Sequence, residues 1–183
     1  MSDNTARVVL LDRDGVINID RPGSVCRVDD FELLPGAADA VADMNRMGYR
    51  VLVITNQACV GRGDLPAAEL DAIHRLMLRQ VSEAGGEIDA IYVCPHRDED
   101  DCNCRKPRPG LIEQAHVDYG FDRAATWMIG DSPRDAEAAL AAGCRAALVR
   151  SGQRLQTPPG TGVTVFDNLS AFVRQLEERR SAS

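Results

Sequence analysis

Short apolar runs alternate along the chain with longer amphipathic segments, and no other feature of the sequence restricts the fold as strongly. The apolar runs are rich in valine and isoleucine, and the run at 49–55 shows no alternation of polar and apolar residues. Such runs are typical of strands that are buried on both faces of a parallel sheet. We therefore expect strands at 8–11, 49–55, 90–94, 126–129 and 146–149, with an edge strand at 163–166.

Helical patterns lie between these runs. In the segment that follows Pro66, the spacing of Leu70, Ile73, Met77 and Val81 predicts one buried face of a helix. Further helices are expected at 35–48, 110–119, 133–142 and 169–179. Strands that alternate with helices imply a parallel α/β sheet with right-handed crossovers.

Length and charge limit the class of protein. The 183 residues suit a single domain spanning 1–183. A net charge of −7 argues against nucleic acid or an anionic membrane as a partner. We see neither a secretory signal nor an apolar stretch near the ~20 residues that a membrane helix needs. The expected protein is cytoplasmic and monomeric, and it acts on a small molecule.

Polar residues follow several of the predicted strands. Asp12 and Asp14 come directly after the run at 8–11, while Thr55 and Asp131 each follow another strand. Ligands of open parallel sheets bind at the carboxyl ends of the strands. These side chains should therefore converge on one site.

The residue types in this site suit phosphoryl transfer. Asp12 is the candidate nucleophile, which would form an aspartyl-phosphate, and Asp14 is the candidate general acid and base. Thr55 can donate a hydrogen bond to phosphoryl oxygens, and Lys106 adds a fixed positive charge. Asp131 would join Asp12 in binding Mg²⁺, which prefers oxygen ligands.

Two more residues extend this prediction. Asp135 is placed to support the metal from behind its ligands, and Arg105 is a candidate for bidentate recognition of a substrate phosphate or hydroxyl. Taken singly, each motif has an ordinary structural explanation, such as a solvated turn or a helix cap. Their joint occurrence, each after its own strand, favours a catalytic site.

A second cluster combines three cysteines with a histidine. Cys94, His96, Cys102 and Cys104 match the donor set of a tetrahedral structural Zn²⁺ site. The residues between them are charged and lack apolar side chains, so this segment (residues 94–104, the cysteine–histidine loop) needs a metal to hold its shape. Unligated cysteines and an iron–sulfur cluster are the alternatives, and histidine suits the cluster less well.

The chain resembles the haloacid dehalogenase superfamily of phosphatases over nearly its whole length. The motifs that carry the resemblance are Asp12-Arg13-Asp14-Gly15, Thr55-Asn56-Gln57, Lys106-Pro107 and Gly130-Asp131-Ser132-Pro133-Arg134-Asp135. The resemblance implies a Rossmann-like parallel sheet sandwiched by helices, and Mg²⁺ bound partly by the main-chain carbonyl of Asp14. The second aspartate separates the phosphatases of this superfamily from its dehalogenases.

Specificity must come from loops, because the segments between the motifs leave no room for a large cap domain. Within the superfamily, the cysteine–histidine loop is similar to that of two families, the heptose-bisphosphate phosphatases and the histidinol-phosphate phosphatases. Local strings such as Val60-Gly61-Arg62-Gly63 and Cys104-Arg105-Lys106-Pro107-Arg108-Pro109-Gly110 are closer to the heptose family. That resemblance implies hydrolysis of a C7 phosphate to leave a heptose 1-phosphate for lipopolysaccharide or other surface glycans.

Several residues are candidates for contacts to the sugar and to its second phosphate. They are Asp20, Arg21, Pro22, Gly23, Asn56, Gln57, Arg62, Arg105 and Arg108. The segment Arg21–Ser24 departs from the glycine–tyrosine type associated with the heptose family, so the preferred sugar and anomer stay open.

Two other classes of protein are alternatives. A phosphorelay receiver also uses Asp, Thr and Lys on a parallel sheet, but its phosphorylated aspartate follows the third strand and it has no cysteine–histidine loop. A zinc-stabilised interaction module with a decayed site is disfavoured by the intact set of acids and by Lys106. Turnover of any phosphate monoester would exclude it.

Overall fold

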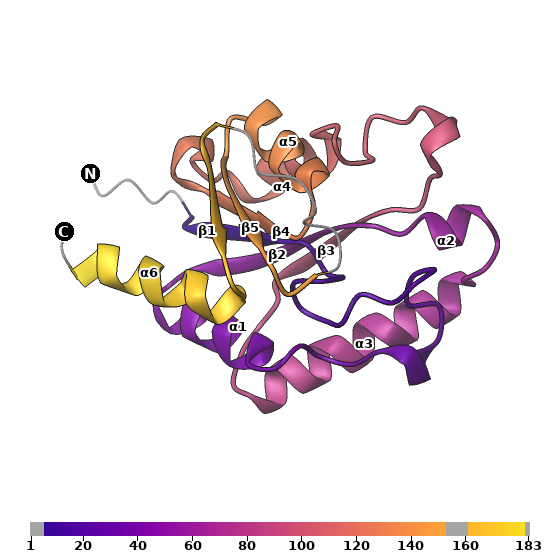
Figure 1. The fold of residues 1–183 in the computed structure, drawn as a ribbon, viewed down its shortest axis with the longest axis horizontal. Coiled ribbons are helices and arrows are strands. Elements are labelled where there is room, and N and C mark those ends of the chain that lie inside the picture. Colours follow the sequence, from indigo (N-terminus) through magenta and orange to yellow (C-terminus); the bar gives the residue numbers. More distant parts are fainter. Residues whose placement is uncertain (1–5, 153–160, 182–183) are drawn as a thin grey trace.

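The computed structural model describes residues 6–152 and 161–181. Six parallel strands form one sheet in the order β3-β2-β1-β4-β5-β6 (Figure 1). The strands are β1 (Val8–Leu11), β2 (Arg50–Asn56), β3 (Ala90–Cys94), β4 (Trp127–Gly130), β5 (Arg145–Val149) and β6 (Val163–Phe166). The parallel α/β sheet and the edge position of its last strand are as the sequence predicts.

Helices cover both faces of the sheet. The helices are α1 (Ala37–Arg46), α2 (Ala58–Gly61), α3 (Ala67–Glu83), α4 (Gly110–Tyr119), α5 (Pro133–Ala141) and α6 (Leu169–Ser181). Buried side chains of α1, α3 and α6 form one core cluster with the sheet, and those of α4 and α5 form another on the opposite face (Figure 1). The predicted sandwich is thereby confirmed.

Strand β1 explains why the apolar runs show no polar alternation. Val9 and Leu11 pack into the cluster under α1 and α3, whereas Val8 and Leu10 pack under α4 and α5. All four side chains are buried. Burying such a side chain contributes about 1.5–3 kcal/mol, so both faces of the strand demand apolar residues.

The helix α5 begins in the manner that its sequence dictates. The Oγ of Ser132 accepts a hydrogen bond from the backbone of Arg134, and the carboxylate of Asp135 accepts one from the backbone of Ser132. Pro133 occupies the first turn, where no backbone donor is needed. This capping box fixes Asp135 at the carboxyl end of β4.

The strand order changes direction at β1, which lies between β2 and β4. The backbone N–H of Asp12 donates to the carbonyl of Ile129, so the chain leaves β1 in register with β4. Thr55 lies within β2 rather than after it, because Thr55 and Asn56 still pair with Val93 and Cys94 of β3. The carboxyl ends of β1, β2 and β4 therefore meet at a switch point, where α/β proteins bind ligands.

The described residues hold no further sheet above this edge. A single 3-10 turn, Val28–Asp30, lies between β1 and α1, and another, Asp98–Asp100, lies between β3 and α4. The site is therefore bordered by loops. No helix in the described part of the chain is both long and apolar enough to cross a membrane.

Candidate active site

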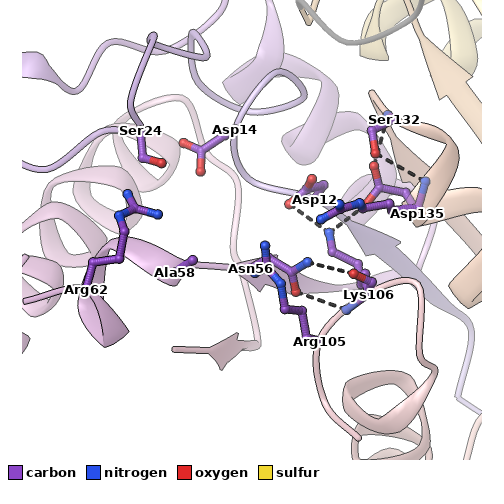
Figure 2. A pocket seen from close by; sticks show the side chains of 11 residues that line it. Asp12, Asp14, Ser24, Asn56, Ala58, Arg62, Arg105, Lys106, Ser132 and Asp135 are labelled. Atoms are coloured by element: carbon purple, nitrogen blue, oxygen red, sulfur yellow. Dashed lines mark hydrogen bonds and ion pairs between the residues drawn. The ribbon is translucent and has the colours of Figure 1, made fainter. Parts of the chain in front are cut away.

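Three buried carboxylates converge at the switch point. Ligand atoms of Asp12, Asp131 and Asp135 all lie within 4.8 Å of one another. Lys106 Nζ is 3.0 Å from an oxygen of Asp12 and 2.6 Å from one of Asp135 (Figure 2). One buried ammonium thus faces more negative charge than it can neutralise.

This imbalance appears in the pKa of Asp12. Burial, the largest cause, and the neighbouring carboxylates of Asp135 and Asp14 together raise it to about 7, although Lys106 opposes the shift. Burial would lower the pKa of Lys106, but the two carboxylates raise it above its usual value. Lys106 is therefore a permanent cation, and a further positive charge would favour the ionised form of Asp12.

Lys106 is held by β2 as well as by the acids. Its Nζ donates to the carbonyl of Ile54 at 2.8 Å. The side-chain amide of Asn56 forms two hydrogen bonds of 3.1 Å with the backbone of Lys106, one to its carbonyl and one from its N–H. The lysine is thereby fixed over the end of the sheet with almost no contact with solvent.

The acidic cluster fits a divalent cation that prefers oxygen. A Cβ atom at Gly15 or at Gly152 would overlap the carboxylate of Asp131, so two glycines leave space for this side chain. The donor set of buried carboxylates suits Mg²⁺ rather than a metal that prefers sulfur or imidazole. The residues present at this end of the sheet therefore fit Mg²⁺.

Asp14 has a different environment. Its carboxylate accepts hydrogen bonds from Arg13 (3.0 and 3.1 Å from Nη2, 3.3 Å from Nε), from Asn18 (2.9 Å) and from Gln57 (2.8 Å). Burial would raise the pKa of Asp14, but the charge of Arg13 and the hydrogen bonds lower it below its usual value. Asp12 and Asp14 thus differ in pKa, which is typical of carboxylates with different roles.

Thr55 and Gln57, the other two residues of the threonine motif, lie beneath the surface. Thr55 is fully buried, and its Oγ1 accepts a hydrogen bond of 2.9 Å from Gln57. Gln57 is also buried and connects Thr55 to Asp14. This glutamine therefore orders the site from below and does not line the cavity.

A cavity of about 150 Å³ opens above these groups. Figure 2 places Arg62 and Ser24 on the side of Asp14, and Lys106 and Asp135 on the far side of Asp12. The predicted residues on its wall are Asp12, Asp14, Asn56, Arg62, Arg105, Lys106 and Asp135. Ser24, Ala58, Ser132 and Arg134 also line it, although the sequence predicts no catalytic or binding role for them.

Arg134, together with Arg105, gives this cavity a second basic wall in addition to Arg62. Asp98 accepts from Arg105 Nε at 2.6 Å and from Arg134 Nη1 at 3.2 Å, so one carboxylate holds the two guanidinium groups side by side. Arg134 follows the Gly130-Asp131-Ser132 motif by two positions and is the second residue of α5, and this place in the sequence was the available signal. Ser24 has a φ of 81°, which its sequence context does not reveal.

Other predicted substrate residues lie outside this cavity. Arg21 pairs with Glu32 at 2.8 Å, and Asp20 is buried. Arg108 donates to the carbonyls of Asp101 and Cys102, at 2.7 Å each. Arg108 lines an adjoining hollow instead, while Pro22 and Gly23 are exposed in the loop after Asp20.

The cysteine–histidine loop brings its four candidate ligands together. Cys104 Sγ lies 3.2 Å from Cys94 Sγ and 3.4 Å from Cys102 Sγ, and 3.3 Å from His96 Nδ1. The four ligand atoms lie within 4.8 Å of one another. Three sulfurs and one imidazole at such spacing fit a tetrahedral zinc ion.

Comparison with known proteins points to one family. A family model described as HAD-hydrolase-like matches residues 103–172. A Pseudomonas aeruginosa protein named D-glycero-beta-D-manno-heptose-1,7-bisphosphate 7-phosphatase is 39% identical over 172 residues, covering 92% of this chain and 97% of that protein. The protein of the same name from Neisseria meningitidis serogroup B is 41% identical over 182 residues, covering 96% and 97%.

Solved structures agree with this finding. The D,D-heptose 1,7-bisphosphate phosphatase of Bordetella bronchiseptica, complexed with magnesium and phosphate, has a TM-score of 0.91 and 38% identity, covering 94% of this chain and 99% of that one. The enzyme of the same name from Burkholderia thailandensis has a TM-score of 0.73 and 34% identity, covering 93% and 98%.

Proposed function

The chain belongs to the haloacid dehalogenase-like hydrolases, in the family of the heptose-1,7-bisphosphate 7-phosphatases, and we propose that it removes the C7 phosphate of D-glycero-β-D-manno-heptose 1,7-bisphosphate. The product is the heptose 1-phosphate. The observation that carries the proposal is the Asp12 carboxylate, 3.0 Å from Lys106 Nζ, at the base of an arginine-lined cavity. The β anomer follows from the names of the relatives.

Asp12 and Asp14 divide the chemistry. An oxygen of Asp12 attacks phosphorus, and the bond from phosphorus to the C7 oxygen breaks. Asp14 donates a proton to that oxygen from its protonated form, which its lowered pKa makes the minor form before the reaction. Asp14 then takes a proton from water, and the water oxygen attacks the phosphorus of the aspartyl-phosphate. Inorganic phosphate leaves, and both carboxylates return to their starting states.

Lys106 and Thr55 stabilise the phosphoryl group during both steps. Lys106 Nζ lies beside the attacking oxygen, where negative charge develops on the transferred group. Thr55 Oγ1 is a further hydrogen-bond donor at the same strand end, and Asn56 keeps the lysine in place.

Asp12, Asp131 and the main-chain carbonyl of Asp14 would hold Mg²⁺, and Asp135 would support them through Lys106 and the cap of α5. When bound, Mg²⁺ neutralises the nucleophile and the phosphoryl oxygens and so permits two anions to meet. Cys94, His96, Cys102 and Cys104 would hold a structural Zn²⁺ that orders the segment leading to Arg105 and Lys106.

Basic residues on the cavity wall would bind the second phosphate of the substrate. Arg105 and Arg134 are the leading candidates because Asp98 aligns them, and Arg62 borders the other side of the cavity. Asp20, Arg21, Pro22, Gly23 and Arg108 remain candidates for sugar contacts from neighbouring loops. Guanidinium groups suit phosphate because they can donate two parallel hydrogen bonds.

The setting of the enzyme is also part of the proposal. We infer one catalytic domain over residues 1–183 that acts as a monomer in the cytoplasm, without nucleic acid or membrane partners. None of the six cysteines, all of which lie in the described part of the chain, forms a disulfide, which suits a reducing compartment.

Initial rates of phosphate release test this function. The β anomer of the heptose bisphosphate, the α anomer and histidinol phosphate would be compared with Mg²⁺ present. We expect the highest kcat/KM for the β anomer. Higher kcat/KM for histidinol phosphate would overturn the substrate and leave the roles of the aspartates intact.

A further inference from the structure

A buried arginine lies between the two catalytic aspartates in the sequence and has no role in the reaction as derived above. The side chain of Arg13 is fully buried. Its Nε and Nη2 point to the carboxylate of Asp14, and its Nη1 lies 3.3 Å from Nε2 of His74 on α3. A residue 61 positions away thus completes the surroundings of a group that belongs to the active site.

The chemistry of the two side chains determines the direction of this contact. A guanidinium group has only donors and stays charged in proteins. Nε2 of His74 must therefore accept, which places the proton of a neutral imidazole on Nδ1. Burial and the charge of Arg13 lower the pKa of His74 to about 4, in agreement with a neutral ring.

The contact constrains how Arg13 can approach Asp14. The Nη1 arm is occupied by His74, so Nε and Nη2 remain for the carboxylate, at 3.3 Å and 3.0 Å from the same oxygen. Asn18 and Gln57 approach the two oxygens of Asp14 from other directions. The orientation of the Asp14 side chain is therefore set by three partners, and the arginine partner is itself set by His74.

We propose that His74 is a positioning residue, which orients Arg13 and through it the proton-donating side chain of Asp14. His74 does not line the cavity and so acts without touching the substrate. The proposal rests on the proposed function, in which Asp14 protonates the leaving oxygen. It assigns a catalytic effect to a histidine of α3 that comes from outside all the catalytic motifs.

The test compares two leaving groups in one enzyme preparation. An alkyl phosphate such as the heptose bisphosphate needs a proton on its leaving oxygen, whereas p-nitrophenyl phosphate departs as a stable anion. His74→Leu should lower the ratio of kcat for the heptose substrate to kcat for p-nitrophenyl phosphate by about tenfold, a part of the 10²–10⁴ that general acids contribute. The ratio is independent of how much of the variant is folded.

Two further variants separate positioning from packing. His74→Gln keeps an acceptor for Arg13 and should restore the ratio to within about threefold of wild type, since the hydrogen bond is retained. His116→Leu replaces another half-buried histidine, which packs on Phe121 in a different part of the molecule, and should leave the ratio unchanged. An unchanged ratio in His74→Leu would overturn the proposal, as would a loss in His74→Gln equal to that in His74→Leu.

A second test of the role of His74 needs no substrate. The ¹⁵N chemical shifts of His74 in the wild-type protein distinguish the protonated ring nitrogen from the accepting one. A proton on Nδ1 supports the proposal, and a proton on Nε2 contradicts it. If the wild-type enzyme hydrolyses no phosphate monoester, the proposed function itself fails. The tautomer of His74 does not depend on turnover, so the two failures can be told apart.

Discussion

At the scale of single residues, the site depends on a buried carboxylate whose negative charge is only partly neutralised by its neighbours. Asp12 and Asp135 both contact Lys106, and burial raises the pKa of Asp12 to about 7. The nucleophile is therefore poised to gain a second cation. Mg²⁺ would supply it and would favour the ionised, nucleophilic form of Asp12.

Replacing the nucleophile gives the simplest prediction at this scale. Asp12→Asn removes the attacking oxygen without adding bulk, so turnover should fall by about 10³-fold or more while the fold is kept. Steady-state phosphate release and circular dichroism would measure the two effects. Asp39→Asn, on the exposed face of α1, is the matched control and should behave as wild type. Activity of Asp12→Asn within tenfold of wild type would sink the mechanism.

His74 predicts how stability depends on pH. Burial and Arg13 lower its pKa to about 4, with Asp71 on its own helix and Asp14 opposing the shift. Between pH 6.5 and 4 the unfolded chain binds a proton that the folded protein does not, so this group stabilises the fold above pH 6.5 and loses that contribution as the pH falls. In urea titrations, the free energy of unfolding should decline less steeply over this interval in His74→Gln than in wild type. If the free energy of unfolding falls equally steeply with pH in both proteins, the lowered pKa of His74 is contradicted.

At the scale of elements, the cysteine–histidine loop and the start of α5 meet over the cavity. Cys104 directly precedes Arg105 and Lys106 in the sequence, and Asp98 of the loop contacts both Arg105 and Arg134. Order in the loop is therefore passed to a catalytic residue and to two basic groups. A metal clip in this loop would support catalysis although it lies outside the reaction.

Breaking the clip should affect stability and activity together. Cys104→Ser removes one of four ligands, and we expect loss of bound zinc and a decrease of more than about 2 kcal/mol in the free energy of unfolding, because structural zinc sites contribute directly to folding. Metal analysis and thermal denaturation would test this. The control variant Cys144→Ser changes a buried cysteine outside the loop, and this protein should keep the zinc bound in the loop. Zinc loss with an unchanged melting temperature would show that the loop is not a structural clip.

The arginine pair yields a prediction about substrate affinity. Arg134→Gln removes one guanidinium from the cavity wall. KM for the bisphosphate should then rise about tenfold, equivalent to ~1.4 kcal/mol. KM for a heptose with a phosphate only at C7 should change little. Arg174→Gln, on the exposed side of α6, serves as control. Equal increases in KM for both substrates would place Arg134 outside the binding of the second phosphate.

At the scale of the whole molecule, the parallel sheet is what gathers the site. Asp12, Thr55 and Asp131 are distant in sequence, yet the order β2-β1-β4 brings their strands side by side. The sequence alone predicts this convergence, because apolar runs reveal parallel strands and ligands bind at their carboxyl ends. The bounds predicted for β3 and for α4 also agree with the structure.

The sequence does not predict the contacts between residues that are far apart in the chain. Helix α2 spans only Ala58–Gly61 and is too short to show periodicity. His74 looks in sequence like any polar residue of α3, and its contact with Arg13 depends on how that helix packs. Gln57 was predicted to bind substrate, but its amide is directed to Asp14 and Thr55, which only the turn after β2 determines.

The most direct test of the account is to follow the β-heptose bisphosphate by ³¹P NMR with enzyme and Mg²⁺. The account predicts that the C7 phosphate signal is lost, that the C1 phosphate signal persists, and that inorganic phosphate appears in equal amount. The same sample with Asp12→Asn should remain unchanged. Loss of the C1 signal in place of the C7 signal, or full turnover by Asp12→Asn, would contradict the account.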